Sequence, residues 1–167
     1  CVAEGESVLP SGQLMWPSLA LPPAQTPAMA LADRATAGCK ARYGDPLPPA
    51  VEERLGHELG VIAHHGYDPL FLVVADAVGY AREQEIPVST RGSVANSLVA
   101  YALGITTVDP IEHGLLFERF LNPGRTDPPD IDLDFCSRRR DEIQDYVRNT
   151  YGADRVALVG AMSTLQL

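Results

Sequence analysis

Three aspartates alternate with apolar residues in the segment Pro129-Asp130-Ile131-Asp132-Leu133-Asp134-Phe135. Because alternate residues of a β-strand face the same side, an extended segment would put Asp130, Asp132 and Asp134 on one face. Like charges on one face repel each other, and a bound divalent cation is the usual compensation. Carboxylate oxygens are hard ligands that suit Mg²⁺ or Mn²⁺. Two such ions bridged by aspartates activate a hydroxyl and stabilise a leaving phosphate, which is the chemistry we expect of this segment.

Three other interpretations of the aspartates stay open. A calcium loop beginning D-x-D-x-D needs glycine at its sixth position and glutamate at its twelfth, where this chain has Phe135 and Asp141. A solvated edge strand could use the acids to deter aggregation. In a mixed interpretation one aspartate binds no metal and caps a neighbour, and Asp134 lies nearest the start of the next predicted helix.

The segment Arg91-Gly92-Ser93 is the second candidate for chemistry. It precedes a predicted helix in which Val94, Leu98 and Ala102 recur at helical spacing. A glycine lets a phosphate approach the backbone, and a helix start offers free N–H groups to an anion. Gly-Ser before a helix is also an ordinary N-cap, so this motif does not decide by itself. The phosphate loop G-x-x-x-x-G-K-[ST] and the dinucleotide motif G-x-G-x-x-G do not occur in the sequence.

Two arginines follow, one on each side of an Asn-Pro-Gly turn. Arg119 lies in the segment Phe-Glu-Arg-Phe, and Arg125 comes directly after the turn. The arginine fork suits phosphate oxygens, so both side chains are candidates for binding phosphate. Salt bridges with Glu118 or Asp127 are the structural alternative.

The elements that must position these residues alternate between helix and strand. Helices are predicted over 29–42, 51–65, 70–85, 94–103, 114–121 and 137–151, and strands over 86–89, 130–135 and 156–159. The apolar run 70–74 could equally begin as a buried strand. Prolines are concentrated in residues 1–49, a composition typical of a linker or an extension from a preceding domain. The pattern predicts an α/β domain that begins near residue 50.

Composition excludes several classes of protein. The formal net charge is −9, which excludes a basic arm that binds nucleic acid by bulk charge alone. Three scattered cysteines favour a reducing, cytoplasmic location over a disulfide framework or a zinc site. The sequence lacks a run of apolar residues long enough for a membrane span, so we expect no membrane partner. Because the chain begins with Cys1 and stops just after a strand-like run, we expect it to be a fragment of a longer protein.

Four sequence blocks, in this order, resemble the palm region of the alpha subunit of DNA polymerase III, the bacterial C-family polymerase. They are Arg91-Gly92-Ser93 with Ser97–Thr106, Leu115–Pro123, Pro129–Phe135, and Arg140-Asp141. The resemblance runs from about residue 50 to residue 167. Thr90 and Asn96 replace glycines that are common in the family, and with Ser137–Arg140 they make the chain similar to the error-prone branch.

The resemblance implies a partial nucleotidyltransferase palm like that of polymerase beta, truncated within residues 50–167, with residues 1–49 as its proline-rich N-terminal extension. It implies that Asp130 and Asp132 are catalytic and bind two Mg²⁺ ions, with Mn²⁺ as a possible substitute. Five residues would bind the nucleotide's phosphates: Arg91, Gly92, Ser93, Arg119 and Arg125. Asp134 is not a metal ligand in the family. A third catalytic aspartate and a phosphate-binding lysine lie further along family members.

The resemblance also implies a function, DNA-directed DNA polymerase. Its substrates would be primer-template DNA and deoxynucleoside triphosphates, and its role error-prone or translesion synthesis in DNA repair or replication. A sliding clamp and other polymerase subunits would bind through regions outside this chain. The isolated chain would be inactive, because one metal ligand is missing. A smaller nucleotidyltransferase and an inactive remnant that serves as a binding module remain the alternatives.

Overall fold

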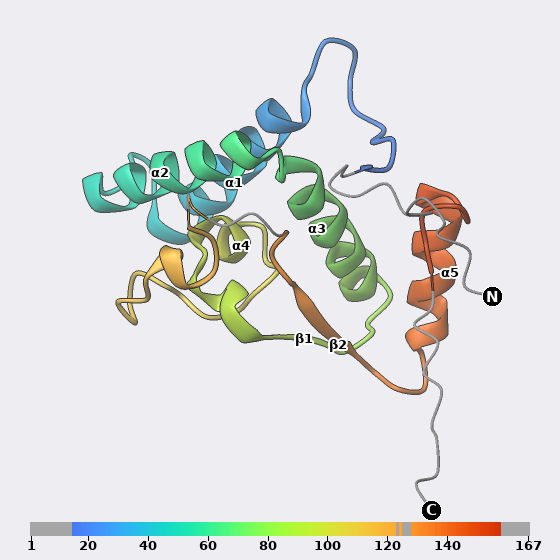
Figure 1. The fold of residues 1–167 in the computed structure, drawn as a ribbon. Coiled ribbons are helices and arrows are strands. Elements are labelled where there is room, and N and C mark those ends of the chain that lie inside the picture. Colours follow the sequence, from blue (N-terminus) through green and yellow to red (C-terminus); the bar gives the residue numbers. More distant parts are fainter. Residues whose placement is uncertain (1–14, 123, 125–127, 158–167) are drawn as a thin grey trace, which may run out of the picture.

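A computed structural model describes residues 15–122, 124 and 128–157. Three long helices come first, followed by a strand, three short helical segments, a second strand and a last helix (Figure 1). In chain order they are α1 (Pro27–Tyr43), α2 (Pro49–His65), α3 (Asp68–Glu83), β1 (Val88–Arg91), the 3₁₀ helix η1 (Gly92–Asn96), α4 (Leu98–Ala102), the 3₁₀ helix η2 (Phe117–Arg119), β2 (Asp132–Phe135) and α5 (Arg140–Tyr151).

The main core lies where α1, α2 and α3 surround the short helix α4. Leu31 of α1, Ile62 of α2 and Leu98 of α4 are completely buried in it. Helix α1 approaches α4 closely because Gly38 has no side chain, and a β-carbon there would overlap the backbone of Ala102. This packing therefore fixes the position of α4, which follows β1 and η1 in the chain.

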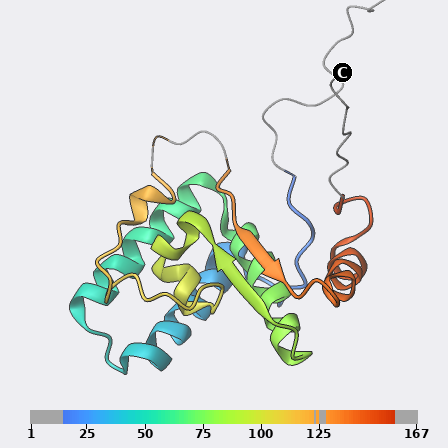
Figure 2. The same ribbon diagram turned by 90° about the horizontal axis from the view of Figure 1, so that it is seen from below.

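Strands β1 and β2 form an antiparallel pair that lies beside the helices (Figure 2). In their register, Thr90 lies opposite Leu133 and Arg91 lies opposite Asp132. Leu133 packs against the main core, and the Thr90 hydroxyl donates to the carbonyl of Ile105. Because side chains alternate along a strand, the opposite face of the pair carries Arg91 and Asp132 toward solvent.

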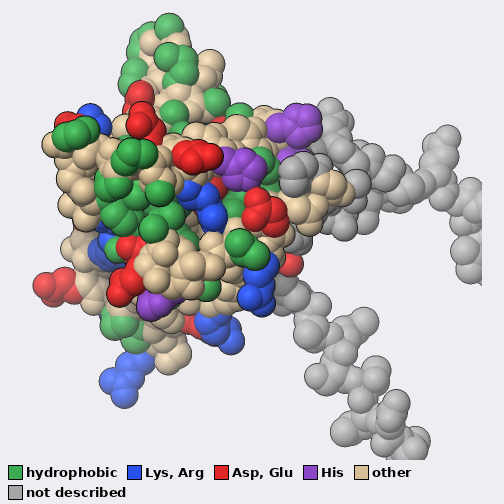
Figure 3. Space-filling model, turned by 90° about the vertical axis from the view of Figure 1, so that its left-hand side faces the viewer, with side chains coloured by type: hydrophobic (Ala, Val, Ile, Leu, Met, Phe, Trp, Pro, Cys, Tyr) green, Lys and Arg blue, Asp and Glu red, His purple; other side chains and the backbone are tan. Residues whose placement is uncertain are grey.

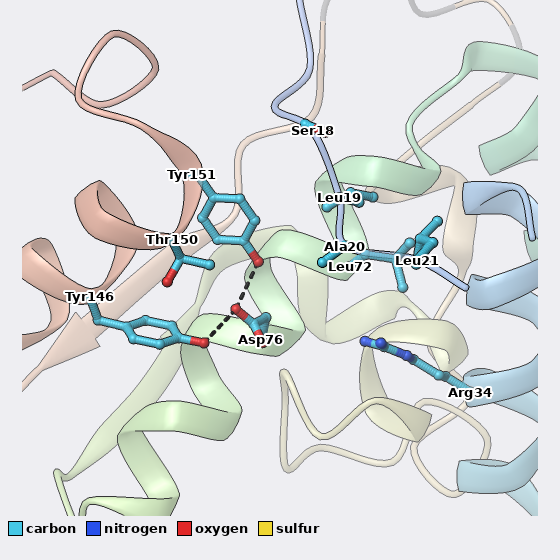
Figure 4. Close-up of a pocket in the computed structure, with 10 residues that line it drawn as sticks. All are labelled: Ser18, Leu19, Ala20, Leu21, Arg34, Leu72, Asp76, Tyr146, Thr150 and Tyr151. Atoms are coloured by element: carbon cyan, nitrogen blue, oxygen red, sulfur yellow. Dashed lines mark hydrogen bonds between the residues drawn. The ribbon is translucent and has the colours of Figure 1, made fainter. Parts of the chain in front are cut away.

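Helix α5 is held against α3 by aromatic side chains. The Asp76 carboxylate of α3 accepts hydrogen bonds from the hydroxyls of Tyr146, at 2.8 Å, and Tyr151, at 2.7 Å (Figure 4). Tyr80 stacks on Tyr146 with ring centroids 3.8 Å apart. Burial, and then the bonds to Asp76, raise the pKa of Tyr146 and of Tyr151. A cavity of about 150 Å³ beside this cluster is also lined by Arg34 of α1.

The helices expected over 29–42, 51–65 and 70–85 are confirmed as α1, α2 and α3, each with bounds within about two residues of the expectation. Gly66 ends α2 with φ 68°, a left-handed conformation that suits glycine. The coarse expectation of a mixed α/β fold is also confirmed, although the described residues contain only a small two-stranded sheet. The polymerase-beta-like palm and the domain boundary at residue 49 stay predictions. Helix α1 packs in the same core as α2.

Other elements differ from the sequence-based expectation. The helix expected over 94–103 is divided into η1 and α4, because Ser97 adopts an extended backbone (ψ 123°) between them. The helix expected over 114–121 is only the single 3₁₀ turn η2, and α5 begins three residues later than expected. The first strand is shifted by two residues, to 88–91. The strand expected over 156–159 is absent at 156–157, and its remainder lies outside the described residues.

Within the described ranges, no helix combines the length and the apolar character that a membrane crossing requires.

Candidate functional site

Strand pairing brings the glycine of Arg91-Gly92-Ser93 next to the aspartate segment. Arg91 ends β1 opposite Asp132, the first residue of β2, so Gly92 leaves the sheet beside that carboxylate. A β-carbon built on Gly92 would lie 3.6 Å from Asp132 Oδ2. Gly92 has φ +80°, a conformation that glycine adopts without the steric penalty of other residues. Two motifs that are distant in the sequence therefore meet at one end of the sheet.

Asp134 has a partner of its own. Arg91 forms an ion pair with its carboxylate, and Arg91 Nη2 donates to Asp134 Oδ1 at 2.8 Å. The Arg91 side chain is largely exposed and the Asp134 side chain is 45% exposed, and surface pairs of this kind contribute only about 0–1 kcal/mol to stability. This pairing agrees with the interpretation in which Asp134 is the aspartate that binds no metal. It also means that Arg91 could exchange its carboxylate partner for a phosphate at small cost.

Asp130 lies just outside the strand. The extended segment was expected over 130–135, but β2 begins at Asp132, so the pleat of the strand does not fix the direction of the Asp130 side chain. Asp130 and Asp132 are both exposed and are separated by one residue. Ile131, between them, packs against the main core and anchors the backbone at this point. The two carboxylates are therefore accessible to a ligand from solvent.

The predicted helix start at Gly92-Ser93 needs correction. The segment forms the 3₁₀ helix η1, in which the Asn96 side-chain amide donates to the Ser93 carbonyl at 2.8 Å. The N–H groups at the start of α4 are not free either. Those of Leu98 and Val99 donate to the Glu58 carboxylate at 2.9 and 3.1 Å. Any phosphate binding at Gly92 would rest on the turn itself rather than on a helix dipole.

Arg119 is exposed on η2, which packs next to η1. Glu118, its expected structural partner, instead bonds to His57 at 3.1 Å. The pKa of Glu118 is lowered, first by a hydrogen bond from its own backbone N–H and then by His57. Arg125, the other candidate, lies outside the described residues.

Figure 3 shows the side of the molecule that is at the left in Figure 1, where acidic, basic and histidine side chains are mixed.

Sequence reasoning missed one partly buried ion pair behind these segments. Arg54 and Glu58 lie one turn apart on α2, with Nε 2.7 Å from Oε1, and Glu58 is completely buried. The sequence did contain a sign of this pair, because Glu58 lies on the same face of α2 as Val51, Leu55 and Ile62, the face that is buried in the core. A glutamate on an apolar stripe requires a buried partner, and an arginine four residues earlier can supply it.

The donors at this end of the sheet suit a hard cation. Mg²⁺ is usually held by one or two carboxylates, substrate phosphates and water, and Asp130 with Asp132 would supply the carboxylates. A complete protein cage is not formed by the described residues, because none of their His, Cys, Asp and Glu side chains gather in a group of three or more placed for a metal.

The sequence matches the family described as the bacterial DNA polymerase III alpha NTPase domain over residues 29–167. The chain belongs to this family. The resemblance inferred from the four motif blocks is thus confirmed, and membership in the DNA polymerase III alpha family extends into α1, ahead of the expected boundary at residue 50.

The curated relatives include proteins of two names. The error-prone DNA polymerase of Dechloromonas aromatica (strain RCB) is 44% identical over 162 residues, which cover 97% of this chain and 16% of that protein. The error-prone DNA polymerase of Burkholderia mallei (strain ATCC 23344) is 47% identical over 149 residues, covering 89% and 14%. DNA polymerase III subunit alpha of Mycobacterium tuberculosis (strain ATCC 25618 / H37Rv) is 52% identical over 131 residues, covering 78% and 11%. The chain thus spans less than one fifth of each of these relatives.

Proposed function

We propose that this chain is part of the palm of a DNA-directed DNA polymerase and contributes the first half of its nucleotidyl-transfer site. The observation that carries the proposal is the adjacency of Gly92 to Asp132 across the β1–β2 pair. Family membership and the names of the relatives support the choice of a polymerase over a smaller nucleotidyltransferase. The proposed fold is a polymerase-beta-like palm, with the N-terminal extension ending at residue 49.

In the proposed reaction, the 3′-hydroxyl oxygen of a primer forms a bond to the α-phosphorus of a deoxynucleoside triphosphate, and the hydroxyl proton passes to solvent. The bond from that phosphorus to the bridging oxygen breaks, and pyrophosphate leaves with the electron pair of that bond. Bound Mg²⁺, held by Asp130 and Asp132, would lower the pKa of the hydroxyl and neutralise charge on the leaving group. The Gly92-Ser93 backbone would receive the triphosphate without a side chain in its way.

Arginine side chains around this turn would neutralise the remaining phosphate charge. Arg91 is held near the site by its exposed pair with Asp134, and Arg119 lies on the neighbouring turn η2. Arginine offers several donors in a fixed fork, which suits the oxygens of a triphosphate. Arg125 is proposed for the same role from the family resemblance alone. Because the template reads the sequence by base pairing, these contacts need no base specificity.

The biological setting is proposed on the relatives' names. The error-prone DNA polymerases of Dechloromonas aromatica and Burkholderia mallei align with 97% and 89% of this chain, against 78% for the subunit alpha of Mycobacterium tuberculosis, and this larger coverage supports a role in error-prone synthesis. Such an enzyme would act on primer-template DNA in the cytoplasm during replication or repair. A sliding clamp and further polymerase subunits would bind through regions outside this chain.

The test is charge removal at the two aspartates in the complete gene product. The double variant Asp130→Ala/Asp132→Ala is expected to lose primer extension and Mn²⁺ binding while keeping its helical circular dichroism spectrum. The control, Glu53→Ala/Asp145→Ala, removes the same charge from two exposed acids on α2 and α5 and should extend primers normally. Substantial extension by the first variant would show that the wrong carboxylates have been named. An inactive, folded parent protein would favour the inactive remnant.

A further inference from the structure

The carboxylate of Glu58 joins helix α2 to the start of α4. It is completely buried, and three of its four hydrogen bonds come from the Ser97 hydroxyl at 2.8 Å and from the N–H groups of Leu98 at 2.9 Å and Val99 at 3.1 Å. Its fourth contact is the Arg54 guanidinium. A buried carboxylate with this many donors is fully compensated, and it holds the backbone of residues 97–99 in one place.

Arg54 extends the same connection to two loops. Its Nε donates to Glu58, while its Nη2 donates to the carbonyls of Asn96, at 3.0 Å, and Leu115, at 3.1 Å. The guanidinium also lies 5.9 Å from the ring centroid of Phe117. Asn96 ends η1, and Leu115 comes two residues before η2. One side chain therefore ties together two segments that are separate in the sequence.

Both tied segments belong to the candidate site. The Asn96 side chain donates to the Ser93 carbonyl, which closes the turn that begins at Gly92 beside Asp132. The other segment leads directly into η2, which carries Arg119. A change in the position of the Arg54 guanidinium would move both segments relative to each other.

We propose that Arg54 and Glu58 are positioning residues. They set the distance between the Gly92-Ser93 turn and the Arg119 segment so that both can contact the phosphates of one nucleoside triphosphate. The inference rests on the proposed function, since it assigns both segments to phosphate binding. The contacts of Arg54 also explain why an ion pair, rather than two apolar side chains, occupies this position. A buried apolar pair would fill the same space, but it would leave the Asn96 and Leu115 carbonyls without this donor.

Arg54→Lys separates positioning from folding. Lysine keeps the positive charge beside Glu58, but its single ammonium group cannot pair with the carboxylate and also reach both carbonyls as the fork does. In the complete polymerase we expect the KM for the incoming nucleotide to rise about tenfold, with kcat changed less than about threefold and primer-template affinity unchanged. The matched control is Ile62→Val, a buried position on the same helix whose substitution lowers stability without touching either loop.

A second variant leaves the ion pair in place. Asn96→Ala removes the amide that holds the Ser93 carbonyl and should also raise the nucleotide KM, so the proposal remains testable even if Arg54→Lys fails to fold. If both variants, like Ile62→Val, lower stability but leave the nucleotide KM within about twofold of the parent, the pair is only structural and the proposal is wrong. If the parent polymerase itself incorporates no nucleotide, the proposed function fails and this inference falls with it.

Discussion

Substituting Gly92 by alanine, in comparison with Gly66, separates backbone strain from ligand binding. Both glycines have positive φ, +80° and +68°, and an alanine in that region costs about 1–2 kcal/mol. Neither substitution causes a steric overlap. The new β-carbon at Gly92 would lie 3.6 Å from Asp132 Oδ2, and at Gly66 nothing lies within 4 Å. We therefore expect both variants to lose about 1–2 kcal/mol of unfolding free energy.

Only the Gly92→Ala variant should affect nucleotide binding. Its methyl group would stand where a phosphate must approach the backbone, beside the Asp132 carboxylate. Loss of one hydrogen bond to a charged phosphate corresponds to about 1.5 kcal/mol or more, so the nucleotide KM should rise at least about tenfold. Gly66 ends α2 and belongs to none of the proposed phosphate-binding segments, so Gly66→Ala should leave KM unchanged.

Two measurements decide the outcome. Urea unfolding followed by circular dichroism gives the free-energy loss of each variant, and steady-state primer extension by the complete polymerase gives KM and kcat. Equal nucleotide KM values for both variants would show that Gly92 serves only the turn. Undiminished stability of both variants would refute the argument from positive φ.

Two further predictions concern stability and reactivity. Tyr151→Phe removes a hydrogen bond to the Asp76 carboxylate and should cost about 1.5–3 kcal/mol in urea unfolding at neutral pH. The pKa of Tyr151 is raised in the folded state, so its contribution is fully present below the unfolded pKa of about 10 and is lost as pH rises through the folded pKa. As pH rises above about 10, the unfolding free energy of the variant should therefore fall less than that of the parent. An equal fall in both proteins would contradict the link between Tyr151 ionisation and stability. Burial raises the pKa of the Cys39 thiol to about 11, so iodoacetamide at a pH of about 8 should modify Cys39 only after unfolding, as mapped by mass spectrometry. Rapid labelling of Cys39 in the native protein would contradict its burial.

Helix positions followed from local sequence rules. The apolar spacing of Val51, Leu55 and Ile62 predicts α2, and Gly66 predicts its end, because both signals depend only on neighbours in the chain. The same rules failed between 92 and 103. Ser97 lies in a stretch of helical spacing, yet its hydroxyl and the next two N–H groups bond to Glu58, and this tertiary contact accompanies the break between η1 and α4.

The candidate residues were also recognisable from the sequence, but their relation to one another was not. Residue type and alternation identify Asp130, Asp132 and the Gly92 motif as groups suited to metal and phosphate, because that chemistry belongs to the side chains and the backbone themselves. Strand register decides that Gly92 lies against Asp132 and that Asp134 is paired with Arg91. Register depends on contacts between distant segments, so local sequence could not supply it.

What the sequence alone determined about this protein is its family, its longer helices and the kind of chemistry its acids and glycine turn can perform. The tertiary structure alone decided which acid is adjacent to the turn and which buried pair holds that turn in place. The physical reason is that Arg54 and Glu58 act through backbone groups of residues far along the chain. A hydrogen bond to a distant carbonyl or N–H leaves no pattern in the sequence of the segment that receives it.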